Sequence, residues 1–230
     1  MTWKPSPNIE WVTVKTTLPI YPFPPSSQRR AVMTDRLILR PFKDDDFDLQ
    51  GLHAIRARQE VMHWSIQGRP DRDVEETRQG NFALQLAPND TQRFNLAITL
   101  AATGQVIGIG GCGSFKGEQG WPEVGYMLHP DAWGKGYATE FLQAFLETWW
   151  ALPREEVEIM VDKATVRGDG EVKDEVVSAV ADSPNFASHN VLRKAGFEKS
   201  GVRVEDDLRD LSKKIELHGF IARKGIKTSA

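Results

Sequence analysis

The sequence predicts a mixed α/β domain, because apolar residues recur along it with two different periods. Residues 93–100 and 105–115 alternate in the manner of strands around an Ala-Ala-Thr-Gly turn, which predicts a β-hairpin. Residues 138–149 instead place apolar side chains at helical intervals and are followed by Pro153, which predicts an amphipathic helix. Strand patterns at 122–130 and 175–184 lie on either side of that helix in the chain.

Length and composition limit the classes of protein to which the chain can belong. Its 230 residues fit one domain with appendages, and 40% hydrophobic with 27% charged residues is typical of a soluble globular protein. A formal net charge of -3 gives no basic surplus for binding nucleic acid. One cysteine, a start unlike a secretory signal and no apolar run of ~20 residues predict a cytoplasmic (intracellular) protein without a membrane partner.

The first 30 residues contain prolines at 5, 7, 19, 22, 24 and 25, a spacing that excludes a regular helix and most ladder positions. Apolar residues such as Trp11 and Phe23 would gain free energy by lying against a domain. We therefore expect an extended Pro-rich arm over 1–30 and a domain over 31–225. A disordered tail is the alternative for the arm.

Between the arm and the hairpin the sequence predicts one strand and two helices. Residues 34–42 alternate and stop at a proline, as a short strand does. The next helix starts at three aspartates, of which Asp44 can cap it; a metal site is the less favoured interpretation, because neighbouring helical residues point in different directions. Residues 71–86 predict a second helix, with Asp73 and Glu76 in capping-box positions.

Three glycines in the second arm of the hairpin satisfy the dinucleotide-binding pattern G-x-G-x-x-G at 108, 110 and 113. That motif requires a helix to open at its third glycine, and here a turn-rich loop follows instead. We therefore interpret these glycines as strand positions where the strand kinks or another backbone passes closely. These three glycines are the only support for a third hypothesis, that the protein is a dinucleotide-dependent oxidoreductase.

The C-terminal part begins with residues 153–175, which are charged, broken by glycines and interpreted as an inserted element or surface loop. Residues 185–197 predict a helix that is capped near Asn185 or Ser188 and ends at Gly196. Two strands at 197–204 and 211–223 close the domain.

The stretch HPDAWGKGYATEFL at 129–142 places Gly-Lys-Gly between a strand and a helix. A helix start leaves about four N–H groups unpaired at its positive end, so it attracts anions, and glycines let the backbone approach a ligand closely. A P-loop is disfavoured, because it requires G-x-x-x-x-G-K-[ST] and position 129 is histidine. A tight turn without any ligand is the alternative.

The order of these elements resembles the GNAT-type N-acetyltransferase superfamily over residues 34–223. EVGYMLHPDAWGKGYATE at 123–140 is similar to its acetyl-coenzyme A signature, and NFASHNVLRKAGF at 185–197 is similar to a later motif. Within the superfamily the chain looks most like the branch that contains the ribosomal-protein N-terminal acetyltransferases. The resemblance implies a mixed, mostly antiparallel central sheet of about six to seven strands flanked by helices.

The resemblance also implies how acetyl-CoA would be held. In the family pattern [QR]-x-x-G-x-[GA], Trp133 stands where Gln or Arg is usual, and we expect it to pack under the loop or beside the cofactor. The backbone of 127–128 would pair with the pantetheine arm. The implied contacts with the pyrophosphate and the rest of acetyl-CoA come from Met127, Leu128, Trp133, Gly134, Lys135, Gly136, Tyr137, Ala138, Thr139, Asn185 and Ser188.

Acetyl transfer to an amine needs a base for the amine proton and an acid for the departing thiolate. Glu123 is the candidate base and Ser188 the candidate acid, with a solvent-facing glutamate and a helix N-cap as the respective alternatives. His129 suits loop positioning or solvation better than catalysis, Tyr137 is expected to pack, and Cys112 suits a small buried apolar position. The five histidines show no metal-ligand spacing.

These residues lead to two hypotheses. The first is an acetyl-CoA-dependent N-acetyltransferase that acts on a primary amine, either a protein or peptide N-terminus or a small amine. The second is a non-catalytic acyl-CoA-binding or regulatory module, suggested by Trp133 and the uncertain catalytic pair. Acetyl-CoA and an amine acceptor are the expected partners, no metal is expected, and a homodimer is a possible assembly.

Overall fold

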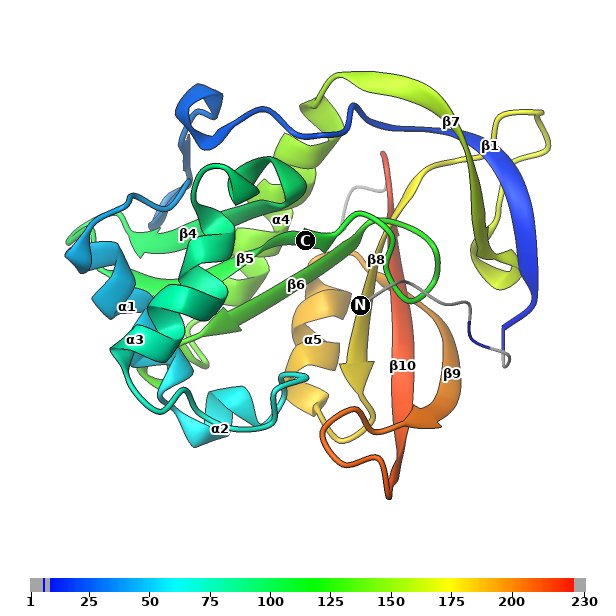
Figure 1. The fold of residues 1–230 in the computed structure, drawn as a ribbon. Helices are drawn as coiled ribbons and strands as arrows, with labels where there is room; N and C mark the ends of the chain where they lie inside the picture. The colour runs from blue at the N-terminus through cyan, green and yellow to red at the C-terminus, as the bar shows by residue number, and fades with distance from the viewer. Residues whose placement is uncertain (1–5, 7–8, 226–230) are drawn as a thin grey trace. The chain divides into compact units, whose positions relative to one another are not determined.

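A computed structural model describes residues 6 and 9–225 of the chain (Figure 1). They divide into two compact units. One contains residues 21–113 and 125–148 and is called here the hairpin unit; the other contains residues up to 20 with 114–124 and 149 onward, and is called the arm unit. No helix among the described residues is long and apolar enough to cross a membrane.

The hairpin unit is built on a sheet of order β2-β3-β4-β5-β6. Its strands are β2 (Val32–Met33), β3 (Leu37–Arg40), β4 (Phe94–Leu100), nearly all of β5 (Val106–Ser114) and the part of β6 (Glu123–Leu128) from Gly125 onward. Its helices are α1 (Asp46–Arg56), α2 (Gln59–Met62), α3 (Val74–Thr77) and α4 (Tyr137–Ala151). The pairs β2/β3, β3/β4 and β4/β5 are antiparallel, which confirms the predicted hairpin.

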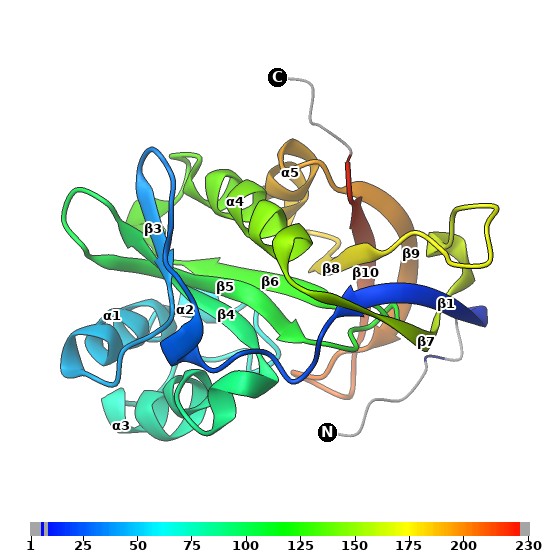
Figure 2. The same cartoon turned by 90° about the horizontal axis from the view of Figure 1, so that it is seen from above.

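Helices cover both faces of this sheet. Figure 2 shows α1 and α3 on one face and α4 on the other. Leu49, Leu52 and Ile55 of α1 are fully buried in a cluster with Ile109 of β5. Asp45 caps α1 by accepting the Asp48 N–H, so the cap lies one residue beyond the predicted Asp44.

The glycines of β5 serve close packing, as expected, and no helix opens at Gly113. A Cβ on Gly110 would lie 2.5 Å from the Phe141 ring, so this glycine lets α4 pack directly onto the strand. A Cβ on Gly108 would meet the Met127 carbonyl of β6 at 2.9 Å. The dinucleotide-binding interpretation has no helix at the required place.

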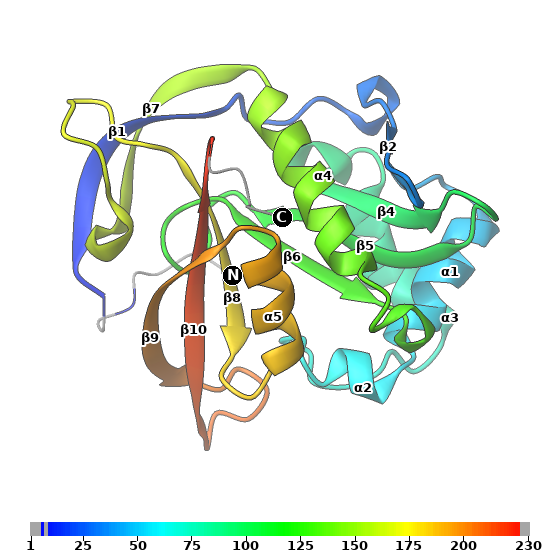
Figure 3. The ribbon, with the colours of Figure 1, turned by 180° about the vertical axis from the view of Figure 1, so that it is seen from behind.

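The arm unit contains the strand order β6-β8-β10-β9 and a separate pair, β1 (Trp11–Pro19) with β7 (Arg154–Asp162). The other elements are β8 (Val176–Asp182), α5 (Phe186–Lys194), β9 (Glu198–Asp206) and β10 (Lys214–Arg223), with α5 seen from behind in Figure 3. β10 is antiparallel to β8 and β9, whereas β6 meets β8 in parallel where Glu123 pairs with Ser178. Trp121 and Val161 centre its core.

Two expectations for this unit need correction. Residues 11–19 form a nine-residue strand that pairs with 154–162 along its whole length, so the view that prolines deny this segment most ladder positions is wrong there. The prolines lie before the strand, after it, or at its last position, Pro19. The same pairing makes residues 154–162 a strand rather than a loop. Residues 1–5 and 7–8 of the expected arm lie outside the described residues.

The fold class predicted from the sequence is confirmed: a mixed, mostly antiparallel sheet flanked by helices. The described residues place eight strands in the sheet order rather than six to seven. The additional strand of this sheet is the two-residue β2, and β1 and β7 form a separate pair. The boundaries between arm, domain and insertion stay a prediction.

Candidate acyl-CoA site

Residues 134–139, called here the amide loop, connect the turn after β6 to the start of α4. Gly134 and Gly136 have φ angles of 72° and 82°, in the left-handed region that favours glycine. The first helical bond runs from the Glu140 N–H to the Gly136 carbonyl at 3.1 Å. Within the described part of the chain, the N–H groups of 134–139 donate to no acceptor. Adjacent amide donors at the positive end of a helix can hold an anion.

Arg36, just before β3, holds the amide loop in place. Its guanidinium donates to the Lys135 carbonyl at 2.9 Å and to the Glu140 carboxylate at 2.7 Å, and it lies over the Tyr137 ring at 4.6 Å. Thr34 donates to the same carboxylate at 2.6 Å. Burial raises the pKa of Glu140, but these hydrogen bonds and the Arg36 charge outweigh it and keep the pKa below its usual value. The carboxylate is therefore a fixed anchor for the loop.

Sequence reasoning missed this clamp. Its partners are far apart in the chain, and no local pattern distinguishes Arg36 from the other arginine beside the strand. Tyr137, expected to pack, does so beneath the Arg36 guanidinium. The Lys135 side chain is exposed.

Trp133 directly precedes the amide loop, and its indole N–H points away from that loop. Its indole N–H donates to the Leu128 carbonyl at 2.9 Å, and the residue is 45% exposed. The indole N–H is therefore used within the protein, and the expected position of Trp133 under the loop or beside the cofactor stays a prediction. Its ring forms one wall of an open pocket beside α2, described below.

The backbone at the end of β6 is where the pantetheine arm was expected to pair. The Met127 carbonyl points at Gly108 of β5, and the His129 N–H donates to the Ile107 carbonyl of β5 at 2.8 Å. Because backbone groups alternate sides along a strand, Met127 turns its backbone toward β5 and Leu128 turns away. The Leu128 carbonyl is already taken by the Trp133 indole. Pairing of Met127 and Leu128 with a pantetheine arm stays a prediction.

Glu123, the first residue of β6, lies in the arm unit in a half-buried position. Its Oε2 atom accepts the Glu118 N–H at 2.9 Å. Burial raises the pKa of Glu123 to about 7, the Glu118 charge adds to this rise, and the hydrogen bond and Arg203 oppose it. A carboxylate with a pKa near neutrality can accept and release a proton at physiological pH. The side chain is therefore not the solvent-facing glutamate of the alternative interpretation.

Asn185 and Ser188 lie at the start of α5, also in the arm unit. The Asn185 side chain caps the helix by accepting the Ser188 N–H at 3.1 Å, so Asn185 is the N-cap and Ser188 is not. The N-capping alternative for Ser188 is therefore wrong. Its hydroxyl makes no hydrogen bond to another described residue.

The other two residues considered for chemistry, His129 and Cys112, occupy positions that suit a structural role. The His129 ring accepts the Asp131 N–H at 3.3 Å, which fits loop positioning. Cys112 is buried in β5. Among residues 6 and 9–225, no group of three or more His, Cys, Asp or Glu side chains could hold a metal ion.

Comparison with known proteins agrees with this geometry. Residues 36–198 match the acetyltransferase (GNAT) domain family. The fold is similar to the acetyltransferase (GNAT family) from Bacillus anthracis, at 20% identity and a TM-score of 0.61 over 84% of this chain and 98% of that one. It is also similar to a putative ribosomal-protein-serine acetyltransferase from Vibrio cholerae, at 16% identity and a TM-score of 0.59 over 84% and 97%.

A third similar structure is the microcin C7 self-immunity acetyltransferase MccE in complex with acetyl-CoA and AMP. It shares 13% identity and has a TM-score of 0.58 over 81% of this chain and 92% of that one. At such identities the structures establish a common fold. The family match covers most of the chain, and the protein therefore belongs to the GNAT acetyltransferase family.

Proposed function

We propose that the protein is an acetyl-CoA-dependent N-acetyltransferase that moves an acetyl group to a primary amine by direct attack. The observation that carries the proposal is the amide loop, a row of backbone donors at the start of α4 without acceptors among the described residues, in a member of the GNAT family. A similar structure, MccE, is described in complex with acetyl-CoA. When bound, acetyl-CoA supplies the activated acetyl group.

The amide loop holds the pyrophosphate of the co-substrate in this proposal. The left-handed glycines leave the amides of 134–139 open to a ligand, and the helix start adds positive potential. Arg36 stabilises this conformation through its bonds to Lys135 and Glu140. The Trp133 indole N–H is used by the Leu128 carbonyl and its backbone N–H by the Pro130 carbonyl, so this residue offers the pyrophosphate no hydrogen-bond donor.

Glu123 accepts the proton that the amine loses. The amine nitrogen forms a bond with the thioester carbonyl carbon, the carbon–sulfur bond breaks, and the proton leaves the nitrogen. A raised pKa, set mainly by burial, gives Glu123 the proton affinity of a base that works near neutral pH. Transfer is direct or through a water molecule.

Ser188 protonates the departing thiolate of coenzyme A. Its hydroxyl is not occupied by another described residue, and its N–H is fixed by Asn185. The oxygen can thus donate its proton and regain one from solvent. Asn185 acts by holding the start of α5 in place.

The acceptor is a protein or peptide N-terminus or a small amine. Likeness to a ribosomal-protein-serine acetyltransferase supports testing an N-terminal serine peptide first. We would incubate the protein with acetyl-CoA and a panel of such amines while following release of free thiol. Amine-dependent release is the expected result. Binding of coenzyme A with no release on any amine would favour the non-catalytic acyl-CoA-binding module instead.

A further inference from the structure

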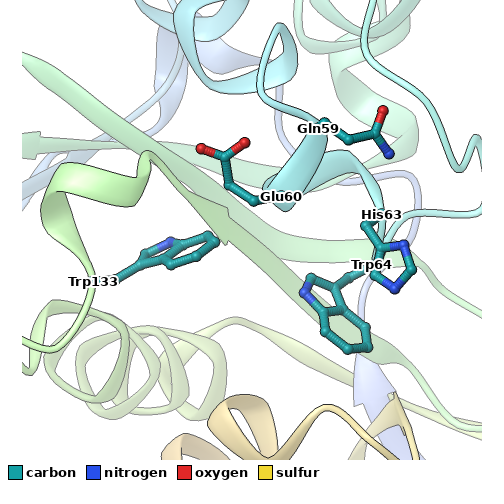
Figure 4. Close-up of a pocket in the computed structure, with 5 residues that line it drawn as sticks. All are labelled: Gln59, Glu60, His63, Trp64 and Trp133. Atoms are coloured by element: carbon teal, nitrogen blue, oxygen red, sulfur yellow. The ribbon is translucent and has the colours of Figure 1, made fainter.

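An open pocket of about 410 Å³ lies in the hairpin unit, beside α2 (Figure 4). Its lining consists of Gln59, Glu60, His63, Trp64 and Trp133. The first four come from α2 and the residues directly after it, and Trp133 comes from the turn before the amide loop. Figure 4 shows the two indole rings on opposite sides of the pocket.

Both rings are held in place while much of their surface stays exposed. The Trp133 ring is tethered by its N–H to the Leu128 carbonyl. The Trp64 ring stands against the His63 ring, with centroids 4.7 Å apart and planes at 77°. Trp133 is 45% exposed and Trp64 is 37% exposed. Fixed aromatic surface of this kind offers a ligand contact area that needs little further ordering.

The charge of the pocket is negative. Among the described residues that line it, Glu60 is the sole carboxylate and none is Arg or Lys. Glu60 is exposed and forms no ion pair or hydrogen bond with any other residue that the structure describes. Figure 4 shows its side chain leaving α2 on the side of Trp133. A carboxylate beside aromatic faces favours an organic cation, because the faces of aromatic rings also carry negative potential.

We propose that this pocket binds an aliphatic ammonium group of the amine acceptor, an identification that rests on the proposed function. The cation lies against the indole faces of Trp64 and Trp133 and pairs with the Glu60 carboxylate. The adenosine part of coenzyme A is the competing occupant for stacked aromatic rings. Its phosphate charges would be repelled by Glu60, so the charge of the pocket favours the cation.

The experiment uses the indole N–H signals of the ¹⁵N-labelled full chain, which contains seven tryptophans. The protein is titrated at pH 8 without coenzyme A, once with 1,5-diaminopentane and once with the uncharged 1,5-pentanediol. We expect the diamine to shift the signals of Trp64 and Trp133, assigned with Trp→Phe variants, and to bind about tenfold more tightly than the diol. Glu60→Gln should weaken diamine binding at least about threefold.

Glu75→Gln is the matched control, because Glu75 is an exposed carboxylate on α3 of the same unit, outside the pocket. It should leave diamine binding unchanged. Equal affinity for the diol, shifts confined to other tryptophans, or an equal loss in both variants would overturn the proposal. So would shifts of Trp64 and Trp133 with adenosine 3′,5′-bisphosphate but not with the diamine. Calorimetry with coenzyme A tests the proposed function separately, since the amide loop can bind it whether or not the cation binds.

Discussion

Replacing Glu123 with glutamine tests its assignment as the base most sharply, because the change removes the proton-accepting group and keeps the shape. The Glu118 N–H can still donate to the amide oxygen of a glutamine at this position, as it does now to Oε2 at 2.9 Å. The expected result is a fall in kcat/KM of about 10²–10⁴ above pH 7, the usual contribution of a general base. Coenzyme A affinity should stay unchanged.

The pH dependence of this loss follows from the pKa of Glu123, which burial raises to about 7. About nine tenths of the carboxyl groups are ionised at pH 8 and about one tenth at pH 6. The base is thus available above its pKa and lost below it. The ratio of wild-type to Glu123→Gln kcat/KM should rise about tenfold per pH unit below pH 7 and level off above it.

The assay follows thiol release from acetyl-CoA between pH 5.5 and 8.5 with one amine and both proteins. Taking the ratio of the two rates cancels the titration of the amine itself. Glu118→Gln provides a second check, since the negative charge of Glu118 raises the pKa of Glu123 and its loss should move the inflection to lower pH. A ratio that does not vary with pH would refute the assignment of Glu123 as base.

Three further changes probe other parts of the molecule. Arg36→Met should weaken coenzyme A binding about tenfold by calorimetry, whereas Arg69→Met, which breaks an ion pair of equal 2.6 Å length, should not. Burial raises the pKa of Glu175 from its usual 4.5 to about 7, so the folded protein favours the protonated carboxyl group. The resulting stabilisation is complete below pH 4.5 and is lost as the pH rises to 7. In denaturant unfolding, Glu175→Gln should remove about 3 kcal/mol of this pH dependence of the unfolding free energy. Trp133→Phe should cost about 1 kcal/mol of unfolding free energy, through its bond to Leu128, and change coenzyme A affinity less than tenfold.

The local parts of the fold could be predicted from the sequence because their signals are local. Alternation defines β4 and β5, and a helical stripe that ends before Pro153 defines α4. The glycines of β5 could be separated from a dinucleotide site because no helix follows Gly113. The reason for Gly110, contact with Phe141 of α4, needed the structure.

Non-local pairing is where sequence reasoning failed. Trp11–Pro19 and Arg154–Asp162 both carry a strand alternation, which was outweighed by the nearby prolines in one and by the charged residues and following glycines in the other. Their pairing with each other is what the sequence does not indicate. A single sequence carries no signal for that register. For the same reason the clamp of Arg36 on Glu140 went unnoticed, although both residues border predicted elements.

The candidate site was predictable to the extent that it depends on backbone. Glycines at 134 and 136 indicated the left-handed turns that the structure contains. Side-chain environments were not predictable, because the raised pKa of Glu123 depends on burial and on Glu118 and Arg203 around it. The sequence allowed either Asn185 or Ser188 as the N-cap of α5, and the hydrogen bond from the Ser188 N–H to the Asn185 side chain identifies Asn185 as the cap.

The most direct test of the central claim is an amide NMR titration of the ¹⁵N-labelled protein with coenzyme A. If the amide loop holds the pyrophosphate, the N–H signals of residues 134–139, which donate to no acceptor within the described residues, should show the largest shifts. Gly136→Ala should weaken coenzyme A binding about 5- to 30-fold in the same titration, because a side chain there strains the backbone at a φ of 82° by about 1–2 kcal/mol. Coenzyme A binding that leaves the signals of 134–139 unmoved would contradict the account.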